Sequence, residues 1–364
     1  MRVLVCTVVH HTTDARIFRR EIGALLDAGI DVTSIAPWPA EGRGDEHHRH
    51  IAVPRAVGRR RLAAWRAARA RIAASAVDAD LLLIHDPELL VVVPWRELRR
   101  LRVPVVWDVH EDLAAALAVK AYLPAIVRRL LVPVVHAVEH LAEQRATLLL
   151  AETAYAARFR RPHSVVLNLP PVADALPEGP RARQAVYVGS ITRARGLDAM
   201  LAMAPTLEAH GIALRLIGEA PSAEDRTRIA ATPGVRWDGA LPNAEALREV
   251  ARSMVGLALL GDLPNYRHSM PTKILEYMAN GCAVVTTPLP LAQEVVGEDG
   301  VVLASFDDVA AAAARAVIDL CDDDARREGM AQRAFVRVQR DYNWNVAGTA
   351  FVAHLRAVAE RRRG

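Results

Sequence analysis

A helix that ends at a glycine and leads directly into a buried strand can be read in residues 268–287, HSMPTKILEYMANGCAVVTT. Pro271 suits the first turn of a helix, where its missing N–H costs nothing, and Gly281 is typical of the residue that follows a helix. The apolar run at residues 283–286 predicts a strand covered on both faces. This helix-to-strand order is typical of doubly wound α/β domains.

Helical patterns and apolar runs continue to alternate along the chain on both sides of this segment. Short apolar runs separated by helical patterns, such as residues 14–28 and 59–76, indicate parallel sheets with helices on both faces. We expect strands at residues 2–9, 31–36, 81–85, 103–109, 147–151 and 165–167 of the first half, and at 185–188, 213–217, 255–260 and 283–286 of the second.

Residues 168–180 contain four prolines and therefore predict a linker between two domains. A length of 364 residues, 52% of them apolar, suits two buried cores. We expect a Rossmann-like domain at residues 1–170, a second at 171–344, and a C-terminal helix, about 345–364, packed back on the first. Ligands of such folds bind in the crevice outside the carboxyl ends of the strands, here between the two facing domains.

The composition indicates a cytoplasmic protein. The three cysteines, Cys6, Cys282 and Cys321, lie far apart, which fits a reducing compartment. Residues 3–9 predict a first strand and not a signal peptide, and no run of 18 apolar residues occurs.

Residues 55–71 hold seven arginines and no acid, a pattern that suits phosphates or the lipid headgroups of the inner membrane face. The alternative is a solvated helix face, and we expect no nucleic-acid partner.

Two segments of the second half predict an anion site. No Gly-x-Gly-x-x-Gly follows the first strand of either half, and no P-loop occurs. Instead, the strand before Gly189 leads through Arg193 and Arg195 into a helix, whose free amides and dipole favour an anion. Lys273, one of only two lysines, stands at the start of the helix described above. Glu276, one turn later, can accept hydrogen bonds from a ribose diol, although both side chains could simply face water.

These residues resemble the retaining glycosyltransferases of family 4, which have the GT-B fold of two facing Rossmann-like domains. The resemblance covers nearly the whole chain. It rests on residues 10–21, 85–87 and 107–111 of the first half and on residues 188–196, 216–219, 239–242 and 273–281 of the second.

The resemblance implies a metal-independent transfer of a sugar, with retention, from a nucleoside-diphosphate sugar to an acceptor such as a hydroxyl-bearing glycan, lipid-linked intermediate or small molecule. Arg195 and Lys273 would clamp the diphosphate, and His110 would face the transferred sugar; these three are the expected catalytic residues. The remaining donor contacts are assigned to Gly189, Arg193, Leu241, His268 and Glu276, with Glu276 at the ribose and the backbone near Leu241 at the base. The acceptor side is assigned to Asp14, Arg16 and Glu111.

The chain departs from the family pattern at three places. Ser190 stands where the family has an arginine, His268 where it has a glutamate, and residues 288–291 replace glycines of many relatives. Two alternatives therefore stay open: a sugar-nucleotide 2-epimerase on the same scaffold, and a catalytically silent sugar-nucleotide-binding subunit. The proposed donor segments contain no evident set of metal ligands, so we expect no cofactor.

Two histidine-containing segments allow other interpretations. His136, Glu139 and His140 match the zinc-protease pattern His-x-x-Glu-His, but apolar residues at helical spacing over residues 123–141 favour a helix packed on a core. That apolar stripe could instead dock on a membrane or a partner. Residues 47–50, His-His-Arg-His, predict a polar loop and not a metal site.

Overall fold

The computed structural model describes residues 1–10, 14–37, 46–110 and 125–361. The chain divides into two compact units. The first consists of Met1–Asn168 together with Asn345–Gly364, and the second of Leu169–Trp344. Each unit has its own parallel sheet and its own hydrophobic core.

The first unit is built on a seven-stranded sheet with the order β3-β2-β1-β4-β5-β6-β7. Every strand pair is parallel. The strands are β1 (Arg2–Cys6), β2 (Asp31–Pro37), β3 (His48–Val53), β4 (Leu81–Ile84), β5 (Val105–Val109), β6 (Thr147–Leu150) and β7 (Ser164–Val165). The central strands β4 and β5 are buried along their whole length, as parallel strands between two helical layers must be.

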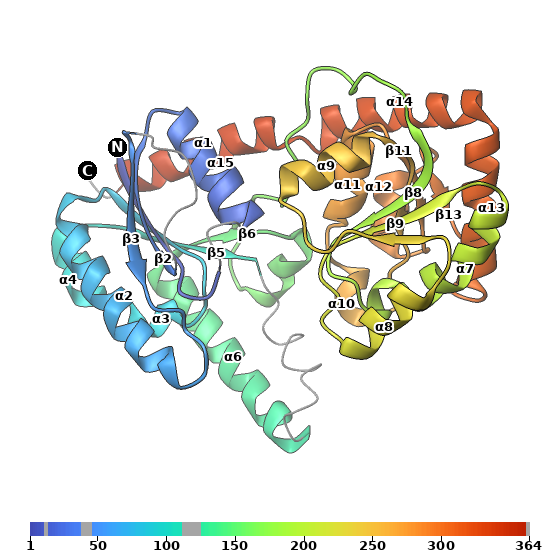
Figure 1. Ribbon diagram of the computed structural model, residues 1–364. Helices are drawn as coiled ribbons and strands as arrows, with labels where there is room; N and C mark the ends of the chain where they lie inside the picture. Colours follow the sequence, from blue (N-terminus) through green and yellow to red (C-terminus); the bar gives the residue numbers. More distant parts are fainter. Residues whose placement is uncertain (11–13, 38–45, 111–124, 362–364) are drawn as a thin grey trace. The chain divides into compact units, whose positions relative to one another are not determined.

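Helices cover both faces of this sheet (Figure 1). On one face lie α1 (Ile22–Asp27), which continues the π-helical segment Ala15–Glu21, and α15 (Trp344–Glu360). On the other lie α2 (Arg61–Ser75), α3 (Leu89–Val92), α4 (Trp95–Leu101) and α6 (Ala125–Arg145). Short 3₁₀ turns at Gly58–Arg60, Ala76–Asp78 and Thr153–Arg158 complete the unit. The C-terminal helix is tied to it by a hydrogen bond from Arg356 to the carbonyl of Ala28.

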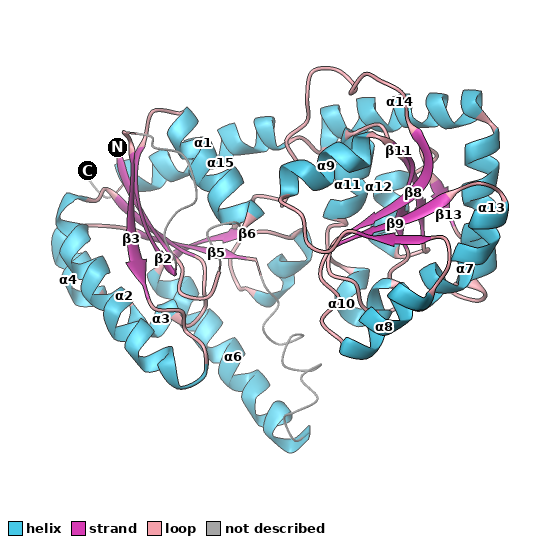
Figure 2. Ribbon diagram, viewed as in Figure 1, coloured by secondary structure: helices cyan, strands magenta, loops and turns pink. Residues whose placement is uncertain are grey.

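The second unit repeats the design with a six-stranded parallel sheet, ordered β10-β9-β8-β11-β12-β13 (Figure 2). Its strands are β8 (Ala182–Val188), β9 (Ala213–Ile217), β10 (Val235–Trp237), β11 (Ser253–Ala258), β12 (Ala283–Thr286) and β13 (Val301–Val302). Its helices are α7 (Leu197–Ala209), α8 (Ala223–Ala231), α9 (Asn243–Ala251), α10 (Pro264–Arg267), α11 (Thr272–Ala279), α12 (Pro290–Val296), α13 (Val309–Asp322) and α14 (Asp324–Asp341).

The predicted strands occur with ends shifted by a few residues, and the strands β3, β10 and β13 were not predicted. The prediction of a polar loop at residues 47–50 was wrong, because His48–Val53 forms the edge strand β3. An edge strand pairs on one side only and keeps polar side chains in contact with water, so it lacks the continuous apolar run of a central strand. The strands β10 and β13 are three and two residues long, too short to show a pattern.

Helix α6 differs from the expectation of a core-packed apolar stripe. Val138 packs against the core, but Val134 and Leu141 are exposed. In the zinc alternative, Glu139 is a buried side chain that forms ion pairs with Arg158 and, at 3.4 Å, with His136. Within the described ranges, no helix is both long and apolar enough to cross a membrane.

Candidate active site

Both sheets contain a point at which successive connections run in opposite directions. In the first unit this point lies between β1 and β4, and in the second between β8 and β11. The loops that follow such neighbouring strands diverge and leave room for a ligand at the carboxyl edge of the sheet. Some of the predicted site residues lie at these two edges: Gly189 follows β8 in the second unit, and His110 follows β5 in the first.

In the second unit, Gly189 and Lys273 lie together at the end of β8. Gly189 has a φ of +128°, and a β-carbon added to it would stand 3.4 Å from the Lys273 Nζ. The ammonium also lies 4.0 Å from the centroid of the Tyr187 ring, a cation–π contact. Tyr187 is fully buried, and its hydroxyl donates to the carbonyl of Ser190. The lysine, the glycine turn and the aromatic ring thus form one cluster.

Helix α11, which carries Lys273, is anchored to the sheet by Tyr277. The Tyr277 hydroxyl accepts a hydrogen bond from the Val188 N–H at 3.1 Å and donates to the Leu257 carbonyl at 3.1 Å. It therefore bridges β8 and β11 near the point at which they separate. Gly256 makes room for the ring, because a β-carbon there would come within 2.5 Å of it. Lys273 lies one helical turn before this anchor, so the anchor sets its position.

The surroundings of Lys273 lower its pKa to about 7. Burial is the largest cause, the positive charge of Arg195 is the second, and Glu276 opposes both. Arg195 itself is half-buried in the 3₁₀ turn Arg193–Arg195, directly before α7. Two cations held close together without a counter-charge of equal strength form a preorganised site for an anion.

The other predicted donor residues lie at different distances from this cluster. Arg193 is held by α8, since it forms ion pairs with Glu224 at 2.5 Å and with Asp225 at 3.4 Å. Leu241 is half-buried in the loop after β10. This loop lies near the end of β9, because the N–H of Gly218, which follows β9, donates a hydrogen bond to the Gly239 carbonyl. His268 is exposed at the end of α10.

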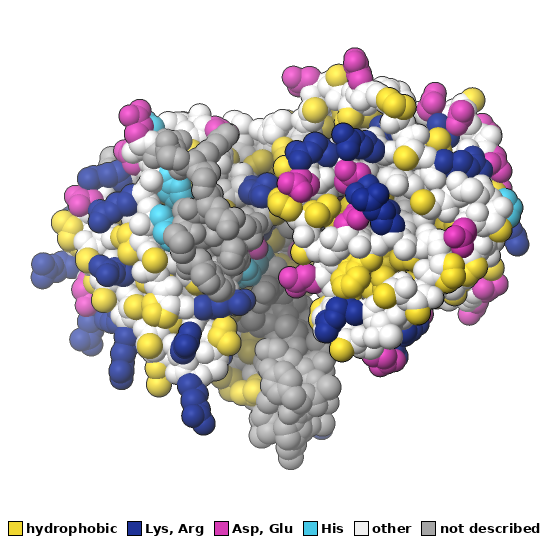
Figure 3. All heavy atoms as spheres, viewed as in Figure 1, with side chains coloured by type: hydrophobic (Ala, Val, Ile, Leu, Met, Phe, Trp, Pro, Cys, Tyr) yellow, Lys and Arg dark blue, Asp and Glu magenta, His cyan; other side chains and the backbone are white. Residues whose placement is uncertain are grey.

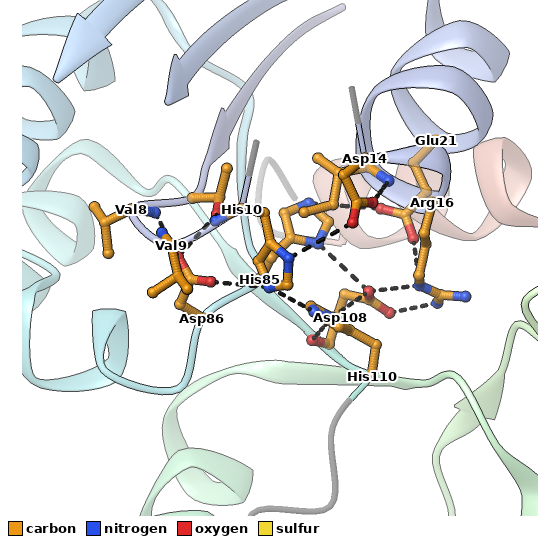
Figure 4. Close-up of polar contacts among 12 residues, drawn as sticks. Val8, Val9, His10, Asp14, Arg16, Glu21, His85, Asp86, Asp108 and His110 are labelled. Atoms are coloured by element: carbon orange, nitrogen blue, oxygen red, sulfur yellow. Dashed lines mark hydrogen bonds and ion pairs between the residues drawn. The ribbon is translucent and has the colours of Figure 1, made fainter. Parts of the chain in front are cut away.

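In the first unit, the loop after β1 is held by Asp86 from the end of β4. One Asp86 carboxylate oxygen accepts hydrogen bonds from the Thr7 hydroxyl and from the amides of Val8 and Val9. Its other oxygen lies 3.3 Å from the His10 Nε2. The segment 85–87, which carries part of the family resemblance, therefore shapes the turn that presents His10 (Figure 4).

Asp108, on β5, is the centre of a buried polar network (Figure 4). Arg16 binds both of its carboxylate oxygens, through Nε at 2.8 Å and Nη2 at 2.6 Å. His110 Nδ1 lies 3.0 Å, and His85 Nδ1 3.4 Å, from the same carboxylate. Burial alone would raise the pKa of Asp108, but the charge and hydrogen bonds of Arg16 outweigh it and hold the pKa well below its usual range.

Glu21 extends this network behind His85. Its carboxylate is fully buried and lies 3.6 Å from the His85 Nε2 and 3.1 Å from the Arg16 Nε. Burial, followed by the negative charge of Asp108, raises the pKa of Glu21 well above its usual range, although the charge of Arg16 opposes both. Burial also lowers the pKa of His85, which keeps that imidazole neutral.

The predicted acceptor-side residues separate into two groups. Asp14 caps the π-helical segment by accepting from the Ile17 amide and faces His10 at 3.6 Å. Burial would raise its pKa, but the hydrogen bond from His10 and other contacts lower it to about 2. Arg16 is buried and turned toward Asp108, so it organises the site from within. Glu111 lies outside the described residues.

Sequence reasoning had not assigned roles to His10, His85, Asp108, Tyr187 or Tyr277. Asp108 carried a usable signal, because residues two apart on a strand lie on the same face and His110 had been singled out. Its importance comes from a partner 92 residues away in the chain, and no local pattern shows that contact.

Among the described residues, His85, Asp108 and His110 form a group whose ligand atoms lie within 4.8 Å of one another. That spacing alone would allow a metal ion. Arg16, however, already binds both oxygens of Asp108, so a protein cation occupies the place opposite this carboxylate. The described side chains therefore satisfy Asp108 by themselves.

Comparison with known proteins places this geometry in a functional class. Residues 182–323 match the family model of group 1 glycosyl transferases, which spans β8 to α13 and includes Gly189, Arg195 and Lys273. The chain is a glycosyltransferase with the GT-B fold. No curated protein sequence matches it.

Solved structures resemble this glycosyltransferase over its whole length. Sucrose-phosphate synthase from Thermosynechococcus elongatus has a TM-score of 0.70 at 17% identity, over 98% of each chain. HepE from Anabaena, in complex with UDP and glucose, has a TM-score of 0.70 at 14% identity, over 98% of this chain and 100% of its own. WaaG, a glycosyltransferase involved in lipopolysaccharide biosynthesis, has a TM-score of 0.65 at 15% identity, over 96% of this chain and 98% of its own.

Proposed function

We propose that this glycosyltransferase belongs to the retaining enzymes of family 4. It transfers a sugar from a nucleoside-diphosphate sugar to an acceptor hydroxyl without a metal ion. The observation that carries the proposal is the cluster of Lys273, Arg195 and Gly189 at the carboxyl end of β8. The resemblance to HepE, which binds UDP in its solved structure, supports a nucleoside diphosphate as the ligand.

The charges of the cluster suit the leaving group of this reaction. The bond between the anomeric carbon and the diphosphate oxygen breaks, and the bond to the acceptor oxygen forms on the same face of the sugar. The acceptor proton passes to the departing diphosphate. As negative charge grows on that group, Lys273 and Arg195 stabilise it, and losing one such preorganised donor costs roughly 10²–10³ in rate.

The first unit supplies the sugar and acceptor side in this proposal. His110 contacts the transferred sugar. Asp14 is linked to His110 by His10, which contacts both side chains. Glu276 holds the ribose, because it lies one turn after Lys273 on α11, and the backbone near Leu241 contacts the base. These assignments rest on the family resemblance.

Binding of nucleoside diphosphates tests the donor site. A thermal-shift screen of nucleoside diphosphates and their sugars, followed by calorimetry, is expected to show binding to the wild-type protein, because a ligand of the folded state raises its melting temperature. Lys273→Ala is expected to weaken that binding. Absence of binding by any nucleoside diphosphate would refute the proposal. Formation of an epimer without an acceptor would favour the epimerase alternative.

We also propose that the first unit contacts membranes through the start of α2. Val57 and Leu62 are 53% and 62% exposed, next to the arginines at residues 59–61. Figure 3 shows basic side chains among apolar ones over α2 and α4. Apolar side chains flanked by arginine suit an anionic lipid surface. Sedimentation with anionic vesicles is expected to pellet the protein, and equal sedimentation with neutral vesicles would contradict the charge argument.

A further inference from the structure

Asp108 receives hydrogen-bond donors on every side that the structure describes. Its side chain is fully buried, and the Arg16 guanidinium covers both oxygens in a two-point contact. The nitrogens Nδ1 of His110 and of His85 approach the oxygen Oδ2 from two further directions (Figure 4). The charged Arg16 keeps this carboxylate ionised, and an ionised carboxylate can only accept hydrogen bonds.

This arrangement determines where the proton of His110 lies. A nitrogen 3.0 Å from an accepting carboxylate must carry a hydrogen, so the Nδ1 of neutral His110 is protonated. The Nε2 of the same ring is then a bare acceptor. It faces the Nε2 of His10 at 3.1 Å, and that contact is favourable only if His10 donates. The Nε2 of His10 also lies 3.3 Å from Asp86, so its N–H is shared between that carboxylate and His110, and its Nδ1 lies 3.6 Å from Asp14.

The backbone supports the same orientation. Asp108 and His110 are two residues apart at the end of β5, so their side chains leave the same face of the strand. The carboxylate cannot move away from His110, because the Arg16 Nη2 is also bonded to the Val166 carbonyl at 3.1 Å. Arg16 thus ties β5 to the segment after β7 and holds the carboxylate in place.

We propose that Asp108, held by Arg16, is a positioning residue that keeps His110 in the Nδ1–H tautomer, so that its Nε2, which accepts from His10 in the free protein, accepts from a hydroxyl of the reacting sugar when that hydroxyl replaces His10. The catalytic consequence rests on the proposed function, whereas the tautomer itself does not. The opposite tautomer would place an N–H there, so the hydroxyl would have to accept and could not donate to the ring.

Nitrogen-15 NMR of the imidazole rings in the wild-type protein tests the tautomer directly. Long-range ¹H–¹⁵N correlations distinguish a protonated Nδ1 from a protonated Nε2, and His110→Gln assigns the ring by loss of its signals. We expect the proton on Nδ1 of His110. A proton on Nε2 would overturn the proposal, whether or not the protein transfers sugars. Asp108→Asn is expected to shift His110 toward the Nε2–H form.

Kinetics of Asp108→Asn test the consequence. An aspartate-to-asparagine change of this kind in a serine protease lowers kcat by about 10⁴ with the geometry preserved, through the wrong tautomer. We expect a fall in kcat of at least about 10²-fold, with the KM for the donor changed less than about threefold, because the diphosphate cluster lies in the other unit. A wild-type kcat in Asp108→Asn would overturn the proposal.

Glu143→Gln is the matched control. Glu143 is a buried carboxylate of the same unit that also holds a histidine, with His163 Nε2 at 3.0 Å. The Glu143→Gln variant is expected to leave kcat and the NMR spectrum of His110 unchanged. An equal loss of kcat in Glu143→Gln would show that any weakening of the unit lowers activity and would overturn the assignment. If no variant and no wild-type preparation transfers sugar, the NMR result still decides the tautomer, and only the proposed function fails.

Discussion

Binding of a nucleoside diphosphate is expected to be coupled to uptake of a proton by Lys273. In the free protein the pKa of this lysine is lowered to about 7, by burial first and by Arg195 second. A bound diphosphate supplies the negative charge that the free site lacks and raises the pKa again. Affinity is therefore full below pH 7 and falls as the pH rises above it, because the neutral lysine must be protonated before the complex forms.

The size of this effect follows from the pKa. At pH 8 about 0.9 of the free Lys273 is neutral, so binding takes up about 0.9 proton. Between pH 7 and pH 9 the protonated fraction falls from about one half to about 0.01, which weakens binding about 50-fold. The terminal phosphate, with a pKa near 6, is ionised over this range and adds little.

Calorimetry at pH 8 in two buffers of different ionisation enthalpy measures the uptake. The control is Lys273→Arg, whose guanidinium stays charged at every pH used. We expect about 0.9 proton for the wild-type protein, almost none for Lys273→Arg, and a flat affinity profile for that variant between pH 7 and pH 9. Equal proton uptake by the two proteins would refute the assignment of Lys273 as the titrating contact.

Lys273→Ala should lower transfer roughly 10²–10³-fold with an unchanged melting temperature, measured by nucleotide release, and wild-type turnover would remove the lysine from the mechanism. His110→Ala should spare nucleotide affinity in calorimetry but reduce transfer strongly; a parallel loss of both would show a structural role. Transfer should persist in EDTA, and a loss restored by Mg²⁺ or Mn²⁺ would show a metal requirement. Tyr277→Phe should lower the free energy of unfolding by about 1–3 kcal/mol in a denaturant melt, because the half-buried Val188 N–H loses its acceptor and the buried Leu257 carbonyl loses its donor; an unchanged midpoint would contradict this.

The parallel sheets of both units could be predicted from short apolar runs, since a central strand between two helical layers has apolar residues on both faces. The edge strand His48–Val53 could not, because one open edge tolerates the polar residues that also mark loops. The apolar residues at helical spacing over residues 123–141 were an equally ambiguous signal. An apolar stripe shows that a helix is amphipathic but does not show which surface covers it, and Val134 and Leu141 are exposed.

The same division holds for the candidate site. Gly189, Lys273 and Glu276 could be located from sequence, because a glycine turn and a lysine at a helix start are local features whose chemistry depends on near neighbours. Lys273 also stands out as one of two lysines in the chain. Its lowered pKa could not be foreseen, since the burial and the approach of Arg195 depend on how two loops pack.

By itself, the sequence of this protein determined its α/β class and indicated Gly189 and Lys273 as candidate residues for an anion site. Only the tertiary structure decided that Arg16 would face Asp108 and not a ligand, and that Asp108 would orient His110. The physical reason is the range of the interactions. Periodicity and helix ends are set by residues a few positions apart, whereas the ionisation of Asp108, on which the orientation of His110 depends, is set by Arg16, 92 residues away, which only folding brings into contact.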